Sequence, residues 1–395
     1  MNNYMINPLY IYTISYGIVL IVYSFGWSVL YPMLSYELLT FLFITGILSF
    51  FVGKFLGEIK IDLKQDIKLS QKMINKMQAI LIIGYFAEFI YAGSVPLFSN
   101  IIYHDFRGIP FIHPLLVTIN IFISTYLFYT YIKYKRKKYI VYYFINLIPS
   151  ILLISRSIIV IILISSIFVY LSMKISFKKL FNFKFIIIMT ISILIAGYLF
   201  GVTGNFRTNK LFNDTNLFSS ESIISIGMPT EKFLNSKIPK EYFWDYLYIS
   251  SPLANLQVQM NISNHENNIY KFILSSILPD ILTKRLIDGN ILSNITTSTD
   301  RISGALTVST AYSAPYMLLG YTGMIIFYLY TVIICVVYSL LLRKYSDLYI
   351  VGVSILCTII LLNTFGNMFV YSGISFSLLW PLFFLFSRKA KVKLK

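Results

Sequence analysis

Long apolar runs recur along the whole chain, and they constrain its fold more than any other feature. A helix needs about 20 apolar residues to cross a hydrocarbon core of about 30 Å, and each run comes close to that length. Charged residues make up only 12% of the sequence, against about 25% in soluble domains. The sequence therefore predicts an all-α polytopic membrane protein. We place ten spans, at residues 9–31, 36–53, 78–97, 111–132, 139–154, 157–173, 185–203, 313–342, 348–366 and 372–387.

The basic residues orient these spans. Cytoplasmic loops of membrane proteins carry an excess of lysine and arginine. In the ten-span arrangement most of the 33 basic residues fall on one side, within residues 54–76, 133–138, 174–184, 343–344 and 388–395. We expect this side, with both termini, to be cytoplasmic. Because the charge is spread over short loops, the net charge of +17 reflects topology and predicts no nucleic-acid partner.

One large polar segment, residues 204–312, interrupts the apolar sequence. It divides the chain into an N-terminal bundle of seven spans (1–203), an extracytoplasmic loop (204–312), and three C-terminal spans with a basic tail (313–395). Only this loop offers enough polar side chains to build a site, so we expect function on its face of the membrane. Residues 241–249 and 270–278 are too apolar for a free linker, and we predict interfacial helices there.

Arginine is enriched on the outward side, whereas the cytoplasmic loops use mainly lysine. A guanidinium pairs bidentately with phosphate oxygens, so this enrichment predicts an anion site for a phosphate or pyrophosphate. The alternative is that these arginines pair with acids of the loop, namely Asp214, Glu221, Glu231, Glu241 and Asp245. That alternative is weaker for two of them, because an unpaired charge at the end of a span is costly. The candidates are Arg107, Arg156, Arg207 and Arg301, of which Arg156 and Arg207 are at span ends.

Glu88 is unusual because it is a carboxylate in the middle of the third span. Such a group costs about 3 kcal/mol to insert, so it should face the bundle interior, and we expect Arg156 as its partner. A catalytic role and a structural ion pair both remain open. Asp105 is a more accessible candidate for a general base, and His113, at the start of the fourth span, is another candidate site residue.

The remaining chemistry-bearing residues suggest no metal or redox centre. Three histidines without ligand spacing predict no metal site, and Cys335 and Cys357 lie within apolar spans, as buried small hydrophobes do. Trp244 in the loop could stack on a sugar face, or it could anchor the loop at the interface. We expect no cofactor.

The chain resembles the Wzy-type O-antigen polymerases, the oligosaccharide repeat-unit polymerases of bacterial inner membranes. The resemblance rests on short motifs that occur in the family's order over most of residues 80–325. These are Ala92-Gly-Ser-Val-Pro-Leu-Phe98, Phe106-Arg-Gly-Ile-Pro-Phe-Ile-His113, Ser155-Arg-Ser157, Gly204-Asn-Phe-Arg207, Tyr248-Ile-Ser-Ser-Pro-Leu-Ala-Asn255 and Leu319-Gly-Tyr-Thr-Gly323. The related lipopolysaccharide ligases carry a loop histidine ahead of a glycine pair, whereas the positions shortly before Gly320 are Ser309, Thr310 and Tyr312, with no histidine. This departure favours a polymerase over a ligase.

The resemblance implies a metal-independent glycosyltransferase of the inner membrane. It would move a growing glycan from undecaprenyl pyrophosphate onto a lipid-linked repeat unit at the periplasmic face, together with a chain-length regulator protein. The four outward arginines would then bind the pyrophosphate, Asp105 or Glu88 would act as the base, and Trp244 and His113 would contact the glycan.

Other classes remain open. A lipid-linked oligosaccharide flippase or another transporter would usually show internal repeats, and none is evident. An O-antigen ligase, a membrane acyltransferase using His104 and Asp105, and a multispan sugar transferase that acts on lipid phosphates are further alternatives.

Overall fold

The computed structural model describes residues 6–58, 68–99, 106, 108–174, 182–211, 216–262, 265–286 and 301–393. This part of the chain is helical, with a single isolated bridge between Ser28 and Pro229. The long helices are α1 (Pro8–Tyr23), α2 (Tyr36–Glu58), α3 (Gln71–Ala92), α4 (Ile112–Tyr134), α5 (Lys137–Leu152), α6 (Arg156–Lys174), α8 (Phe183–Leu211), α11 (Tyr242–Ile262), α15 (Ser313–Leu342), α16 (Ser346–Leu362) and α18 (Leu379–Lys393). The shorter ones are η1 (Pro96–Phe98), α9 (Glu221–Gly227), α10 (Glu231–Leu234), α12 (Ile269–Phe272), η3 (Ile273–Ile277), α13 (Asp280–Leu286), α17 (Ser372–Ser375) and η4 (Phe376–Leu378).

Each predicted span overlaps helical residues, and six helices in the described part of the chain are long and apolar enough to cross a membrane. These six are α2, α3, α4, α6, α8 and α15, while α1, α16 and the helical residues 372–387 are apolar but shorter. The all-helical membrane fold is thus confirmed, and the count of ten spans stays a prediction.

The first span is shorter than predicted. Helix α1 ends at Tyr23 rather than at residue 31, and Gly26 follows with a φ of +61°, a conformation that favours glycine. Beyond it the backbone runs against the large loop, where Thr230 N donates to Trp27 O at 2.8 Å and Val29 N donates to Met228 O at 2.9 Å. These loop contacts replace the last turns of the expected helix.

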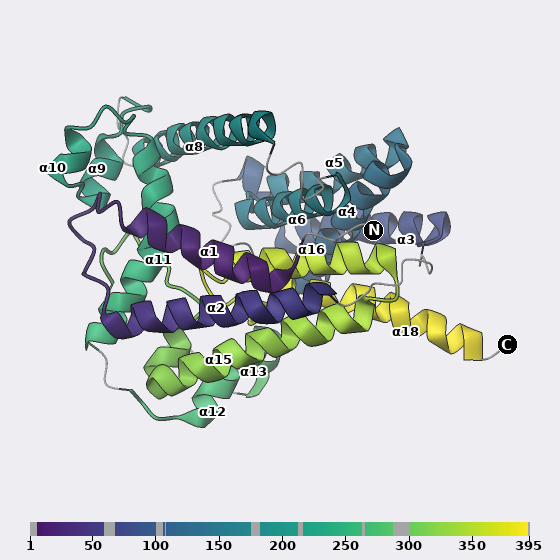
Figure 1. The fold of residues 1–395 in the computed structure, drawn as a ribbon. Coiled ribbons are helices and arrows are strands. Elements are labelled where there is room, and N and C mark those ends of the chain that lie inside the picture. Colours follow the sequence, from purple (N-terminus) through teal and green to yellow (C-terminus); the bar gives the residue numbers. More distant parts are fainter. Residues whose placement is uncertain are drawn as a thin grey trace.

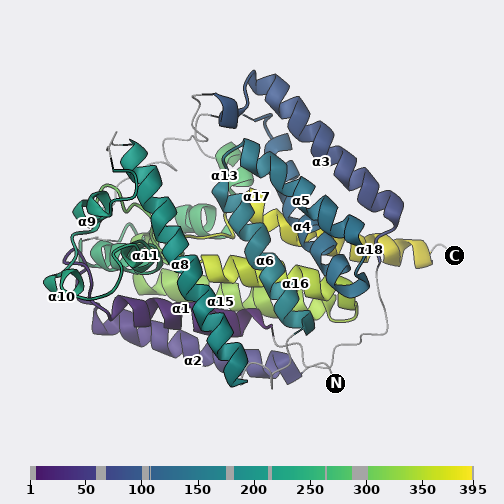
Figure 2. The ribbon, with the colours of Figure 1, turned by 90° about the horizontal axis from the view of Figure 1, so that it is seen from above.

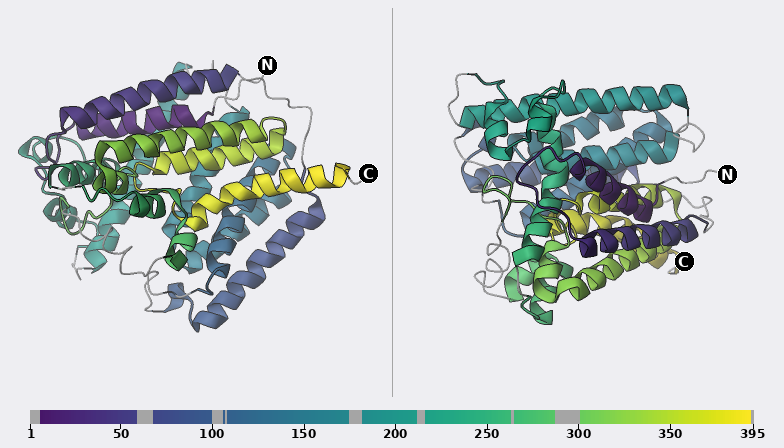
Figure 3. Two further views of the ribbon diagram at one scale, coloured as in Figure 1. Left: turned by 90° about the horizontal axis from the view of Figure 1, so that it is seen from below. Right: turned by 60° about the vertical axis from the view of Figure 1, so that its left-hand side comes forward.

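The helices form a bundle whose two ends differ (Figure 1). The start of α1 and the end of α18 lie at one end, and α9, α10 and α11 lie at the other, which we call the α11 end. Helix α11 crosses this end steeply to the axes of α1 and α2, and further views show the same arrangement (Figure 3). The polar loop therefore gathers at the end opposite the termini.

Helix α4 is the centre of the bundle, with 83% of its apolar window buried. It packs against α3, α5, α6 and α17. Many buried polar side chains between the helices hydrogen-bond to one another, because no water is present there to take their place. For example, the Tyr12 hydroxyl lies 2.6 Å from that of Tyr312 and donates to Thr45 Oγ1 at 3.0 Å.

Helix α15 is broken near its start, at the α11 end. Gly320 has a φ of +61° and a ψ of −147°, outside helical geometry. The break frees carbonyl groups that the preceding loop satisfies, because Glu266 N donates to Met317 O and Asn268 N donates to Leu318 O, both at 3.2 Å. Loop and helix are thereby joined at this end of the bundle.

Candidate functional site

Helix α8 meets α11 along a row of glycines near its C-terminal end. A Cβ on Gly201 would lie 2.2 Å from the carbonyl oxygen of Glu241, and one on Gly204 would lie 2.7 Å from the ring of Trp244. Small residues let helix backbones approach closely. The predicted loop therefore begins as a helix, since α8 continues to Leu211, and α11 is fixed against it.

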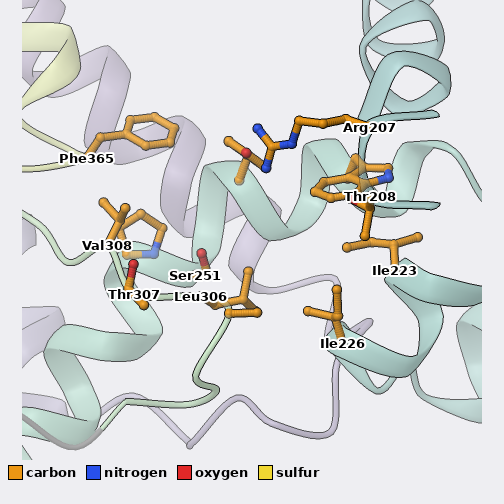
Figure 4. Close-up of a pocket in the computed structure, with 13 residues that line it drawn as sticks. Arg207, Thr208, Ile223, Ile226, Ser251, Leu306, Thr307, Val308 and Phe365 are labelled. Atoms are coloured by element: carbon orange, nitrogen blue, oxygen red, sulfur yellow. The ribbon is translucent and has the colours of Figure 1, made fainter. Parts of the chain in front are cut away.

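A cavity of about 370 Å³ opens beside this junction (Figure 4). Helices α8, α9 and α11, the segment 305–308 and Phe365 line it. Among the lining residues only Arg207 is charged, and its guanidinium reaches across the cavity toward Phe365. The volume lies at the lower end of the range for small-molecule sites. The lining residues are Arg207, Thr208, Ile223, Ile226, Trp244, Tyr248, Ser251, Pro252, Ala305, Leu306, Thr307, Val308 and Phe365.

One buried side chain on α11 holds the irregular wall of this cavity. Asn255 Nδ2 donates to the carbonyl oxygens of Leu306 and Val308, both at 2.7 Å, and Asn255 Oδ1 accepts from Ile302 N at 2.9 Å. The side-chain amide thus both donates to and accepts from backbone groups of this segment, as the backbone of a neighbouring strand would. Asn255 belongs to a sequence motif quoted above, but its contacts could not be inferred from sequence.

The structure brings together Arg156 and Arg207, two of the four predicted arginines. Arg156 is the first residue of α6, and its guanidinium is close enough to that of Arg207 for the two charges to repel, with Tyr248 also interacting with Arg156. Both arginines are exposed. In the part of the chain that the structure describes, no carboxylate lies within 4 Å of either guanidinium. Two neighbouring cations with no carboxylate partner among the described residues form a candidate anion site.

The other two arginines and the first base candidate are placed differently. Arg107 and Asp105 lie outside the described residues. Arg301 precedes the segment that Asn255 holds, and it does not line the cavity. Asp214, one of the loop acids named as possible partners, is also outside the described residues.

Trp244 is an internal anchor that also lines the cavity. It is 5% exposed, its Nε1 donates to Asn205 Oδ1 at 2.7 Å, and its ring lies against Gly204. Its polar atom is therefore already used. Glycan contact by Trp244 stays a prediction. The place of Trp244 on the cavity wall would allow such a contact.

Glu88 is fully buried and is partnered by His113. Its Oε2 lies 2.9 Å from Nδ1 of His113, so the expected pairing with Arg156 is wrong. The reason is that α3 packs along α4, which places the first turn of α4 beside Glu88. Among the described residues Glu88 Oε1 has no hydrogen-bond partner, and a Cβ on Gly108 would lie only 3.0 Å from it. His113 keeps 22% of its side chain exposed, so the pair reaches from the interior toward the surface.

Asp245 is a half-buried carboxylate of the large loop, which the sequence analysis considered only as a possible partner of an outward arginine. It lies on α11 against Gly197 of α8, and its Oδ2 has no hydrogen-bond partner among the described residues. Burial raises the pKa of Asp245 to about 6, because desolvation disfavours the charged form. A lone acid inside the aromatic run from Tyr242 to Tyr248 was the available signal.

Comparison with known proteins fits this architecture. The sequence model of the family described as "Putative O-antigen polymerase" matches residues 6–220, more than half of the chain. That range includes Glu88, His113, Arg156 and Arg207, and it ends before α11 and the 305–308 wall. No curated protein and no solved structure matches the chain. The chain belongs to the O-antigen polymerase family.

Proposed function

We propose that the protein is a surface-polysaccharide polymerase that transfers a growing glycan from undecaprenyl pyrophosphate onto a lipid-linked repeat unit. The reaction takes place at the α11 end of the bundle, on the periplasmic side of a bacterial inner membrane. The observation that carries the proposal is that Arg156 and Arg207 lie near enough for their charges to repel, with Arg207 in the wall of a cavity, in a chain of the O-antigen polymerase family.

The arginine pair suits the departing group of this reaction. As the bond from the sugar C1 to the pyrophosphate oxygen breaks, the electron pair and the negative charge stay on the lipid pyrophosphate. Two preorganised guanidinium groups stabilise that charge. Since they come from α6 and α8, both helices must keep their positions for the pair to act.

The pair of Glu88 and His113 suits the acceptor side. A neutral His113 that donates its Nδ1 proton to Glu88 has a free lone pair on Nε2, which can accept the proton of the acceptor hydroxyl as its oxygen bonds to C1. Glu88 then orients the ring and stabilises the imidazolium that forms. Glu88 therefore serves the base chemistry through His113.

Deletion of the gene in its own host, followed by gel analysis of the surface polysaccharide, tests the proposed function. We expect the ladder to collapse to a single repeat, because export and ligation survive. Loss of every repeat-bearing band would indicate a flippase or ligase, and an unchanged ladder would exclude this pathway.

Complementation with variants then tests the site. Arg156→Ala with Arg207→Ala should fail to restore the ladder. Arg136→Ala is the matched control, because this exposed arginine lies before α5, at the opposite end of that helix from α6. A restored ladder with the double variant would show that these arginines do not hold the pyrophosphate.

A further inference from the structure

The cavity beside the junction of α8 and α11 has a mixed wall, and this wall limits the chemistry of its ligand. Of the thirteen lining residues, one is charged, four carry a hydroxyl group and eight are apolar. Pockets of this kind bind a ligand through apolar surface and fix its orientation with a few polar groups. The hydroxyl-bearing residues are Thr208, Tyr248, Ser251 and Thr307.

Three of the apolar residues, Ile223, Ile226 and Leu306, form what we call the α9 corner. Ile223 and Ile226 are three residues apart on α9, so they share a helix face, and Figure 4 shows them with Leu306 on the side of the cavity away from Phe365. Helix α9 itself lies beside both α8 and α11 (Figure 2). Ile223 and Leu306 are only 1% and 9% exposed. The corner is therefore an enclosed part of the protein and not a surface turned toward lipid.

The polar part of the wall excludes a ligand that is only hydrocarbon. Thr208 is 5% exposed, and its hydroxyl has no hydrogen-bond partner among the described residues. A buried hydroxyl that stays unpaired costs free energy, and a hydrocarbon chain would leave it so. The guanidinium of Arg207 reaches across the same cavity and is suited to phosphate oxygens. The ligand therefore has hydroxyl groups and an adjacent phosphate.

The α9 corner narrows this class further. A sugar with only hydroxyl groups around its ring would place at least one of them against three hydrocarbon side chains, which offer no hydrogen bond. An acetamido group in place of a hydroxyl, or a methyl in place of the hydroxymethyl group, presents a methyl group to the corner instead. The remaining hydroxyls of the sugar stay available for Thr208 and Ser251.

We infer that the cavity holds the sugar attached to the lipid pyrophosphate, and that this sugar is an acetamido or 6-deoxy sugar whose methyl group lies in the α9 corner. The inference rests on the proposed function and adds to it the class of donor sugar and the residues that select it. A volume of about 370 Å³ is at the small end of ligand sites, so one saccharide unit is enclosed and the rest of the glycan extends outside.

Identification of the natural sugar is the first test. The lipid-linked repeat unit is extracted from the deletion strain, mild acid cleaves the pyrophosphate bond, and mass spectrometry with NMR identifies the sugar that is released at the reducing end. We expect an acetamido sugar or a 6-deoxy sugar. A sugar that carries neither group would overturn the inference.

Two variants of one residue test whether the α9 corner selects that sugar. Valine and threonine have nearly the same shape, so Ile226→Val and Ile226→Thr differ mainly in a methyl against a hydroxyl group. The purified full-length variants are assayed in liposomes with the extracted repeat unit. We expect the KM of Ile226→Thr to be several-fold above that of Ile226→Val, the scale on which a pocket discriminates a single group, with similar kcat and melting temperature.

Ile224→Thr is the matched control. Ile224 is on the same helix and is half-buried like Ile226, but it does not line the cavity. Its variant should keep the wild-type KM. Equal KM values for Ile226→Thr and Ile226→Val, or an equal rise for Ile224→Thr, would show that the corner does not contact the sugar.

Farnesyl pyrophosphate, used as a competing inhibitor, separates the sugar from the lipid chain. It carries no sugar, so it should inhibit Ile226→Thr and Ile226→Val equally. If it inhibits Ile226→Thr less, by the same factor as the change in KM, the corner holds the prenyl chain and the inference is wrong.

The deletion ladder separates failure of the inference from failure of the proposed function. A collapsed ladder together with a released sugar that has only hydroxyl groups would leave the proposed function standing and remove the inference. An unchanged ladder would remove the proposed function, and the inference with it.

Discussion

His113 Nδ1 lies 2.9 Å from Oε2 of Glu88, a carboxylate that no solvent reaches. The pair joins α3 to α4 at their packed faces. Removing one member of a buried pair leaves an uncompensated group, which typically costs about 3–5 kcal/mol. The same contact is therefore structural, whatever its catalytic use.

The two roles of His113 can be separated by substitution. His113→Ala should lower the melting temperature in detergent and abolish the ladder, because buried Glu88 loses its partner. His113→Asn places an amide donor where Nδ1 meets Glu88 but has no basic nitrogen, so we expect nearly normal stability without polymerisation. Polymerisation by a stable His113→Asn protein would show that His113 is not the base.

The glycine contact between α8 and α11 makes a second prediction. Gly201→Ala places a Cβ 2.2 Å from the Glu241 carbonyl oxygen, and backbone cannot move away as a side chain can. We expect a destabilisation of about 1–3 kcal/mol or more and loss of polymerisation, since Arg207 is carried by the same helix. Thermal unfolding in detergent measures the first effect.

Gly17→Ala is the control for this prediction. Gly17 also lies within a helix, α1, but no atom lies within 4 Å of a Cβ built on it. This variant should be as stable as the wild type or slightly more so. Equal stability of both alanine variants would contradict the close contact of α8 with α11.

Sequence patterns sufficed for the helices and for part of the site. Apolar length and loop charge placed ten segments, and each is helical. The choice of Arg156 and Arg207 also followed from local reasoning, because a charge at the end of a span is costly unless something pairs with it.

What sequence could not supply were contacts between distant segments. The partner of Glu88 depends on how α3 and α4 align. Hydropathy indicates how deep a residue lies in the membrane, but it does not indicate which helix packs beside it. The prediction of Arg156 as the partner was wrong for this reason. The cavity likewise depends on Asn255 reaching residues some 50 positions away. The predicted interfacial segment 241–249 was only the first part of the longer helix α11.

Asn255 leads to a third prediction. Asn255→Ala removes three hydrogen bonds to backbone groups of the cavity wall, each worth about 1 kcal/mol net. We expect faster proteolysis within residues 301–308 and a weaker ladder. The control is Asn261→Ala, at the exposed end of the same helix, which should change neither the proteolysis rate nor the ladder. If Asn255→Ala were cleaved as slowly as the wild type, Asn255 would not hold the cavity wall.

Asp245 makes stability depend on pH in a direction that can be calculated. Its folded-state pKa of about 6 lies above the ordinary value of about 3.9, so the folded protein binds the proton more tightly than the unfolded chain. This group therefore stabilises the fold most at low pH, and its contribution falls as the pH rises through about 6. Asp245→Asn remains neutral throughout, so its melting temperature relative to the wild type should rise between about pH 5 and about pH 8.

Asp280→Asn supplies a control of opposite sign. Burial would raise the pKa of Asp280, but hydrogen bonds from Ser372 and the contact with Lys284 outweigh it and lower the pKa. The ionised carboxylate therefore stabilises the fold above its unfolded pKa, and this stabilisation is lost as the pH falls through the folded value. Asp280→Asn should consequently be least stable, relative to the wild type, at neutral and higher pH. Parallel pH profiles for the wild type and Asp245→Asn would mean that the α8–α11 contact does not bury this carboxylate.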